Sequence, residues 1–86
     1  HLQQVLTLSL DHVHRSRAEP GCISHSAQID AENPNRVVFF EEWESMGDLK
    51  THFSVPASSE FVNQVARLSV SPPDIRAYAA EPVKLG

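Results

Sequence analysis

Five histidines are the residues of this chain best suited to move a proton or to hold a metal ion. Imidazole titrates near neutral pH, so one histidine can act as a general acid or base. The best candidate base is His52, which follows Leu49 and precedes Phe53 at the border of a predicted helical apolar stripe. From this border the ring can reach a cleft between helix and sheet. The alternative is a half-exposed helical histidine without a role.

His25 is the second candidate base. It shares one face of a predicted strand with Ile23 and Ala27, since alternate side chains of a strand point the same way. The alternative is a core histidine held by one hydrogen bond. His12 and His14 lie two residues apart on a predicted helix, so they point apart and cannot jointly hold a metal. We therefore predict no metal site.

Aromatic side chains near these histidines can form the wall of a substrate pocket. Trp43 ends a predicted strand, and it either packs in the core or stacks on an aromatic ligand. Glu41 shares its strand face, and we expect Arg76 to pair with it because an unpaired buried carboxylate is costly. Tyr78 lines either the pocket or a subunit interface. The predicted pocket residues are Trp43, Phe39, Phe53 and Tyr78.

Composition and motifs exclude several classes of function. A net charge of −4 argues against nucleic acid or an anionic membrane as the main partner. No glycine-rich phosphate loop and no G-x-S-x-G pattern occurs, so we expect neither a nucleotide cofactor nor a serine nucleophile. The single cysteine, Cys22, cannot form an internal disulfide, and it suggests a reducing, cytoplasmic setting. No apolar run approaches the ~18 residues of a membrane span.

Local signals predict an alternation of helices and strands. Apolar spacing predicts a helix over 2–17, with residues 5–10 as a strand being the alternative. Strands are predicted over 22–30 and 36–43, joined by a polar turn over 31–35. The second strand is apolar on both faces early on, so we expect it to be covered on both sides. Helices follow from Ser45 to Pro56 and from Ser58 or Ser59 to Pro72, and a last strand is predicted over 75–80.

Two stretches of the sequence resemble those of a known protein family. R-A-E-P-G-C-I-S-H-S-A-Q-I-D, followed by V-V-F-F-E-E-W-E-S-M-G-D-L-K-T-H-F, resembles the antibiotic biosynthesis monooxygenase family over about residues 1–80. The resemblance implies one domain over 1–86 with an α+β, ferredoxin-like fold, in which an antiparallel sheet carries helices on one face. It implies a homodimer, the dimeric α+β barrel. Members of the family begin with a strand, so we expect a further strand before the first helix.

The same resemblance implies a chemistry. It suggests a monooxygenase without a cofactor that acts on an electron-rich aromatic such as a quinol or an anthrone, with His52 or His25 as the base. A histidine near the position of His52 recurs in the family, whereas many members carry an aromatic residue in place of His25. The alternatives are a ligand-binding or isomerase module, and a heme-degrading protein. The heme-degrading branch uses Asn, Trp and His, and here the Asn would come from the expected first strand.

Overall fold

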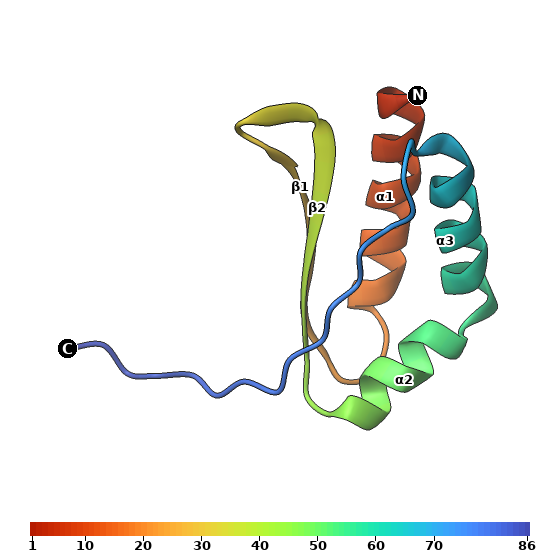
Figure 1. The fold of residues 1–86 in the computed structure, drawn as a ribbon. Coiled ribbons are helices and arrows are strands. Elements are labelled where there is room, and N and C mark those ends of the chain that lie inside the picture. The colour runs from red at the N-terminus through yellow and green to blue at the C-terminus, as the bar shows by residue number, and fades with distance from the viewer.

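The computed structural model describes all residues 1–86 and shows an α+β arrangement. Its elements are α1 (Leu2–Arg17), β1 (Cys22–Asp30), β2 (Asn33–Trp43), α2 (Met46–Ser54) and α3 (Pro56–Leu68). The two strands form an antiparallel sheet, and the three helices lie on one face of it (Figure 1). Helices α1 and α3 lie side by side, and α2 lies near the open end of the hairpin, opposite its turn.

Helix α1 confirms the helical reading of residues 2–17, and the strand alternative for residues 5–10 is wrong. Its last turn carries Arg15 and Arg17, whose positive charge complements the negative end of the helix dipole. The Nε of Arg17 also donates to the backbone oxygen of His25 at 3.0 Å. This bond fixes the end of α1 against β1.

The hairpin is tighter than predicted. Only residues 31 and 32 form the turn, and β2 already begins at Asn33, so the predicted turn over 31–35 is too long. The backbone N–H of Glu32 donates to Oδ1 of Asp30 at 2.9 Å, a local bond that lets two residues reverse the chain. A bulge at Ile23 then sets the register, in which His25 lies opposite Glu41.

Within this chain the sheet is covered on one face only, so the chain itself does not supply the predicted cover of β2 on both sides. Val37, Phe39, Glu41 and Trp43 alternate on the half-buried face. Phe40 lies on the other face and is 59% exposed. The physical reason is the position of the helices, which all pack on the same side of the hairpin (Figure 1).

A serine cap begins α2, and a proline begins α3. Ser45 is the predicted N-cap of α2, and its Oγ accepts the backbone N–H of Asp48 at 3.1 Å. Helix α2 ends at Ser54, just before Pro56, and Pro56 itself begins α3, two or three residues before the predicted start at Ser58 or Ser59. Proline suits the first helical turn because the N–H that it lacks would have no partner there.

The strand predicted over 75–80 is wrong. Residues 70–86 make no backbone–backbone hydrogen bond, and β1 and β2 pair only with each other, so the outer edge of each strand stays unpaired within the chain. The segment runs past the helices and away from the sheet (Figure 1). Arg76 pairs with Asp74 at 3.1 Å, so its expected partner Glu41 is also wrong.

The interior of this small fold is mostly polar. Only Val13 and Phe61 are buried apolar residues. The buried polar residues are Ser9, His12, Ser16, His25, His52 and Ser58. Such groups are costly to bury without partners, so their arrangement points to a site rather than to packing alone. None of the three helices has the length and apolarity needed to cross a membrane.

Gly21→Ala is expected to destabilise the fold. Gly21 has a φ of +83°, and a methyl group there would overlap the carboxyl group of Asp48. The left-handed backbone alone costs about 1–2 kcal/mol for a residue with a Cβ. The matched control is Gly47→Ala, where the nearest atom is 3.6 Å away. Thermal unfolding should show a drop in Tm for Gly21→Ala only, and equal Tm values would contradict this account.

Candidate functional site

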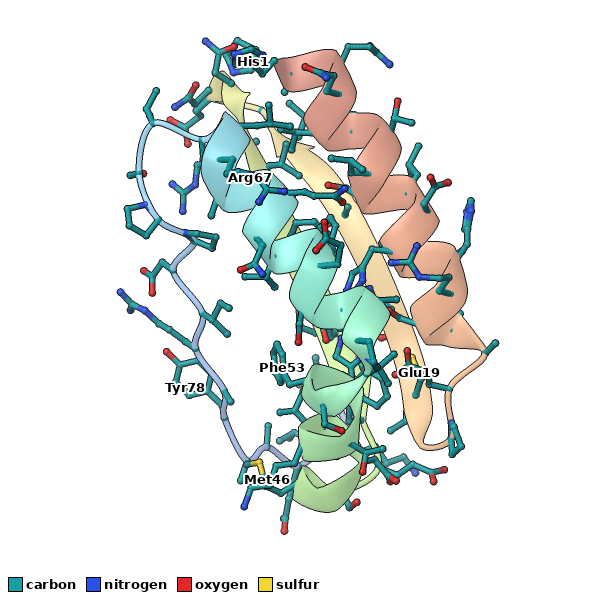
Figure 2. The ribbon with its side chains drawn as sticks, turned by 90° about the vertical axis from the view of Figure 1, so that its right-hand side faces the viewer. His1, Glu19, Met46, Phe53, Arg67 and Tyr78 are labelled. Carbon is teal, nitrogen blue, oxygen red and sulfur yellow. The ribbon has the colours of Figure 1, made fainter.

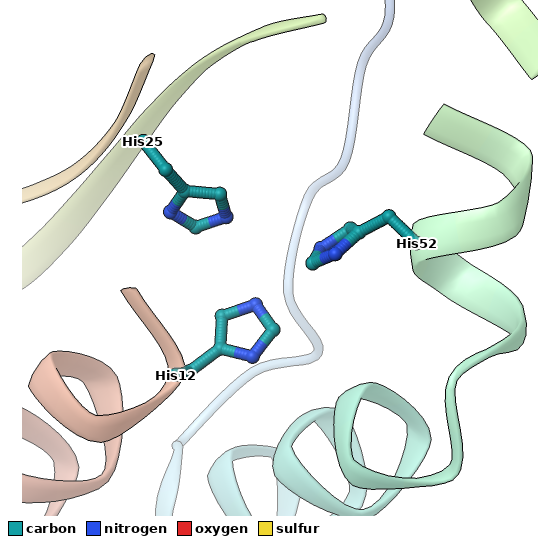
Figure 3. A group of neighbouring side chains, drawn as sticks. All are labelled: His12, His25 and His52. Carbon is teal, nitrogen blue, oxygen red and sulfur yellow. The ribbon is translucent and has the colours of Figure 1, made fainter. Parts of the chain in front are cut away.

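Three buried histidines from three separate elements meet between the helices and the sheet. His12 comes from α1, His25 from β1 and His52 from α2, and one ring nitrogen of each lies within 4.8 Å of the others. Their ring centroids are 5.2–5.5 Å apart. Figure 3 shows the rings pointing toward a common centre. No local pattern in the sequence indicates this cluster, because its members come from separate elements.

Local structure explains how each ring arrives there. On α1, Ser9, His12 and Ser16 follow one another at spacings of three and four, so they share the inward face. The bulge at Ile23 leaves that residue 61% exposed, and it turns His25 to the covered face of the hairpin. His52 lies in the last turn of α2, on the side that faces the sheet.

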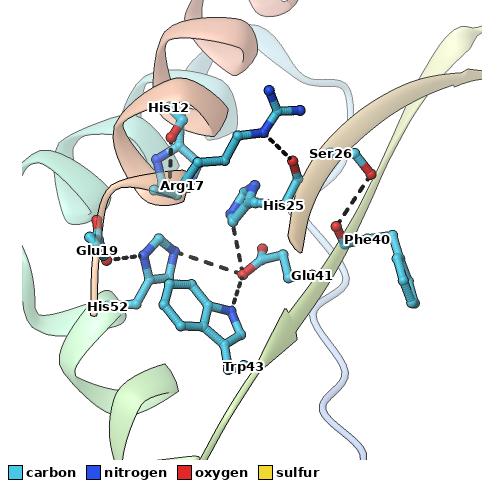
Figure 4. A network of polar contacts seen from close by, with 10 residues as sticks. His12, Arg17, Glu19, His25, Ser26, Phe40, Glu41, Trp43 and His52 are labelled. Atoms are coloured by element: carbon cyan, nitrogen blue, oxygen red, sulfur yellow. Dashed lines mark hydrogen bonds and ion pairs between the residues drawn. The ribbon is translucent and has the colours of Figure 1, made fainter. Parts of the chain in front are cut away.

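Glu41 is the acceptor at the centre of the network. Its Oε1 accepts the indole N–H of Trp43 at 3.0 Å, and it lies 3.3 Å from Nε2 of His25 and 3.8 Å from Nε2 of His52 (Figure 4). Burial pushes the pKa of Glu41 up, but contacts from His25 and Trp43 and the nearby histidine charges outweigh it and hold that pKa below its usual value. Glu41 is therefore ionised at neutral pH.

His52 is held by a second carboxylate. Its Nδ1 lies 2.8 Å from Oε1 of Glu19, in the connection between α1 and β1 (Figure 4). A neutral His52 that donates Nδ1–H to Glu19 carries its lone pair on Nε2, on the side of Glu41. A carboxylate that orients the ring and stabilises its protonated form is the arrangement that makes histidine an effective base. The His52 side chain is 1% exposed, whereas that of Glu19 is 21% exposed.

His12 is neutral at physiological pH. Burial, together with repulsion from His25 and His52, lowers the pKa of His12 to about 4. Its ring stacks on Phe61, with centroids 4.2 Å apart and planes 4° from parallel. This aromatic contact fixes the plane of the imidazole.

His25 is buried without hydrogen bonds. Neither ring nitrogen has a hydrogen-bond partner, and the approach of Nε2 to Glu41 at 3.3 Å is a charge contact that lacks hydrogen-bond geometry. Such an unsatisfied group in a native interior calls for a functional explanation.

The structure brings three of the four predicted pocket residues to the histidines. Trp43 lies 4.7 Å from His52 and Phe53 lies 5.4 Å from it, measured between ring centroids. Phe39 lies 6.5 Å from His25. Tyr78 is 78% exposed on the C-terminal segment, away from this cluster (Figure 2).

Surface hollows flank the helices. One of about 450 Å³ lies between α1 and α3, and no aromatic side chain lines it. Another, of about 250 Å³, includes Phe53 and Ile75, so it lies where α2 and α3 face the C-terminal segment. Figure 2 shows Phe53 pointing toward that segment. The second hollow is the one that contains a predicted pocket residue.

Sequence reasoning missed two members of the network. His12 was set aside because it could not pair with His14, although its spacing from Ser9 and Ser16 marks an inward polar face. Glu19 carries no local signal, since it stands in a connection and meets His52 only after the chain has folded.

Comparisons with known proteins agree with this architecture. The sequence model of the antibiotic biosynthesis monooxygenase family matches residues 1–64. The "Uncharacterized protein sll1783" of Synechocystis sp. (strain ATCC 27184 / PCC 6803 / Kazusa) is 37% identical over 76 residues, which cover 88% of this chain. The chain spans 52% of the length of that relative.

Solved structures show the same fold. A Deinococcus radiodurans protein provisionally described as an antibiotic biosynthesis monooxygenase superposes with a TM-score of 0.92 at 24% identity, covering 99% of this chain and 85% of its own. A conserved protein from Methanosarcina mazei Go1 gives a TM-score of 0.72 at 25% identity, covering 76% of this chain and 64% of its own. The predicted α+β, ferredoxin-like fold is thus confirmed.

Proposed function

Because the chain belongs to the antibiotic biosynthesis monooxygenase family, we propose that it oxygenates an electron-rich aromatic, such as a quinol or an anthrone, without a cofactor. The observation that carries this proposal is the pair formed by Glu19 and His52 beside the ring of Trp43. It combines an oriented base with an aromatic surface. Both are needed where the substrate itself supplies the electrons.

The base removes a proton from the substrate. His52 accepts it on Nε2, and Glu19 stabilises the imidazolium that forms, 2.8 Å from Nδ1. His25 lies across Glu41 from His52 and is the second candidate for this role. Proton transfer to bulk water then runs through Glu19, which is part-exposed.

Oxygen reacts with the resulting carbanion. In the anthrone case the carbanion passes one electron to dioxygen, and the two radicals combine to a peroxide anion. That anion takes a proton and then loses water, so a CH2 group and O2 become C=O and H2O. The substrate supplies all the electrons for this reaction, so no external reductant is required.

Trp43 and Phe53 flank His52 and offer aromatic faces to the substrate. We place the substrate against these two rings, next to the hollow that Phe53 lines. Because His52 is 1% exposed, a movement of the side chains around it must expose Nε2 during turnover.

We further propose that the protein acts as a homodimer in the cytoplasm. Phe40 on the open face of the sheet and Val70, Ile75 and Leu85 on the C-terminal segment expose apolar surface that a second copy can cover. The free thiol of Cys22 suits a reducing setting, and burial raises its pKa, which lowers its reactivity. Light scattering at micromolar concentration should give the mass of two chains.

Oxygen uptake tests the proposed reaction directly. The purified protein is mixed with a panel of quinols and anthrones, without flavin or added metal, in the presence of a chelator. Uptake above the protein-free rate with at least one substrate, with one O2 consumed per product, is expected. No uptake by the intact dimer with any substrate would overturn the oxygenase proposal. A Soret band after hemin addition would then favour the heme-degrading alternative.

A further inference from the structure

We propose that His12, His25 and His52 form a binding site for one divalent transition-metal ion, with Glu41 as the fourth donor. The family resemblance predicts no such site, and no pair of histidines has ligand spacing along the sequence. The site exists only in the folded chain, where α1, β1 and α2 each contribute one imidazole (Figure 3).

The distances suit a metal site in its unloaded form. One nitrogen from each histidine lies within 4.8 Å of the others. Ligand nitrogens bound to zinc at 2.0–2.1 Å in a tetrahedron lie about 3.4 Å apart, so the rings need to close by at most about 1.4 Å. Side-chain rotation supplies such a shift without moving the backbone.

The absence of hydrogen bonds to His25 is expected of a metal ligand whose metal ion is not bound. A buried imidazole normally satisfies its nitrogens, yet both ring nitrogens of His25 lack hydrogen-bond partners at 1% exposure. A metal ion at the common centre would satisfy one of them. Glu41, with Oε1 3.3 Å from Nε2 of His25, brings a negative charge to the same point.

The side chains that would orient the proposed metal ligands are already in place. Glu19 accepts from Nδ1 of His52, which directs Nε2 inward, and Trp43 donates to Glu41. Carboxylate partners on ligand histidines and donors on ligand carboxylates are the usual supports of metal sites. Phe61 fixes the plane of His12 by stacking.

Three imidazoles and one carboxylate favour zinc, copper, nickel, cobalt or ferrous iron over magnesium and calcium, which prefer oxygen ligands. A bound ion would use the lone pair on Nε2 of His52 that the proposed base needs. This consequence rests on the proposed function: zinc should inhibit oxygen uptake, and a chelator should restore it.

Cobalt and zinc titrations test the site independently of activity. The chelator-treated protein is titrated with Co²⁺, and the visible absorption of tetrahedral cobalt is recorded, followed by displacement with Zn²⁺ and by calorimetry. One ion per chain with a zinc Kd of about 1 μM or tighter is expected. Absence of both the cobalt band and the zinc heat would overturn the proposal, whatever the outcome of the oxygen-uptake assay.

Matched variants locate the ion. His12→Gln should weaken zinc binding by more than about 100-fold, whereas His14→Gln, an exposed site on the same helix, should leave it unchanged. Glu19→Gln keeps all three ligands and should weaken binding by about 10–100-fold. If His12→Gln does not fold, the zinc affinity of Glu19→Gln tests the assignment in its place. Wild-type affinity in folded His12→Gln, or in Glu19→Gln when His12→Gln is unfolded, would overturn the assignment.

Discussion

His52→Ala is expected to lower kcat for the aromatic substrate by about 10²–10⁴-fold, which is the usual contribution of general acid–base catalysis. The reason is the removal of the one imidazole that a carboxylate orients, with Nδ1 2.8 Å from Glu19. KM should change little, because Trp43 and Phe53 provide most of the proposed contact with the substrate. Steady-state oxygen uptake measures both parameters.

Two comparisons distinguish a proton role from a structural role. His14→Ala removes an exposed histidine of α1 and should leave kcat unchanged. Glu19→Gln keeps the ring of His52 but weakens its support, so it should lower kcat less than His52→Ala does and shift the pH profile of kcat. Circular dichroism must show folded protein in each case. Unchanged kcat in folded His52→Ala would eliminate His52 as the base.

The use of one cluster for two purposes has a physical basis. A base needs a free lone pair in a dry site, and so does a metal ligand, so a buried neutral histidine suits either. Here Nε2 of His52 cannot serve both at once. The effect of a chelator on oxygen uptake therefore shows whether His52 acts as a base or as a metal ligand during turnover. Activity that survives chelation supports His52 as the base. Activity that requires added metal contradicts that role.

The elements with local signals were predictable from the sequence. The stripe of α1, the alternation of β1, and the cap formed by Ser45 with Asp48 each depend on residues a few positions apart. The strand predicted over 75–80 had an equally good alternation. It fails because a strand forms only by pairing with a neighbour, and this segment pairs with neither β1 nor β2. Pairing is not a property of the segment itself.

The candidate site was predictable only in part, for a related reason. His25 and His52 stood out by type and by position beside apolar residues. The approach of His25 to Glu41 depends on a bulge at Ile23, and the approach of His12 to the other two histidines depends on how α1 packs against the hairpin. Neither feature has a sequence signature within a single element. Long-range register, rather than residue type, makes this set of histidines a site.

Phe61→Ala is expected to cost about 3–5 kcal/mol in free energy of unfolding, the range for large-to-small changes of buried aromatic residues. Phe61 is 7% exposed and is one of only two buried apolar residues, so few neighbours can collapse into the space that it leaves. The total stability of a domain of this kind is about 5–15 kcal/mol, so this loss is a large share. At about 4–8 °C per kcal/mol, Tm should fall by more than 10 °C.

Phe53→Ala is the matched control, because Phe53 is 39% exposed and its ring contacts His52 rather than the core under α1. It should lower Tm far less and instead raise KM for the aromatic substrate. Phe61→Ala also removes the stacked partner of His12 at 4.2 Å, so its loss of stability should be accompanied by weaker cobalt binding in the folded fraction. Equal losses of Tm in the two variants would contradict the assignment of Phe61 as the central apolar contact. That result would place the main stabilising surface outside the fold of one chain, at an interface that Phe40 and the C-terminal segment can form.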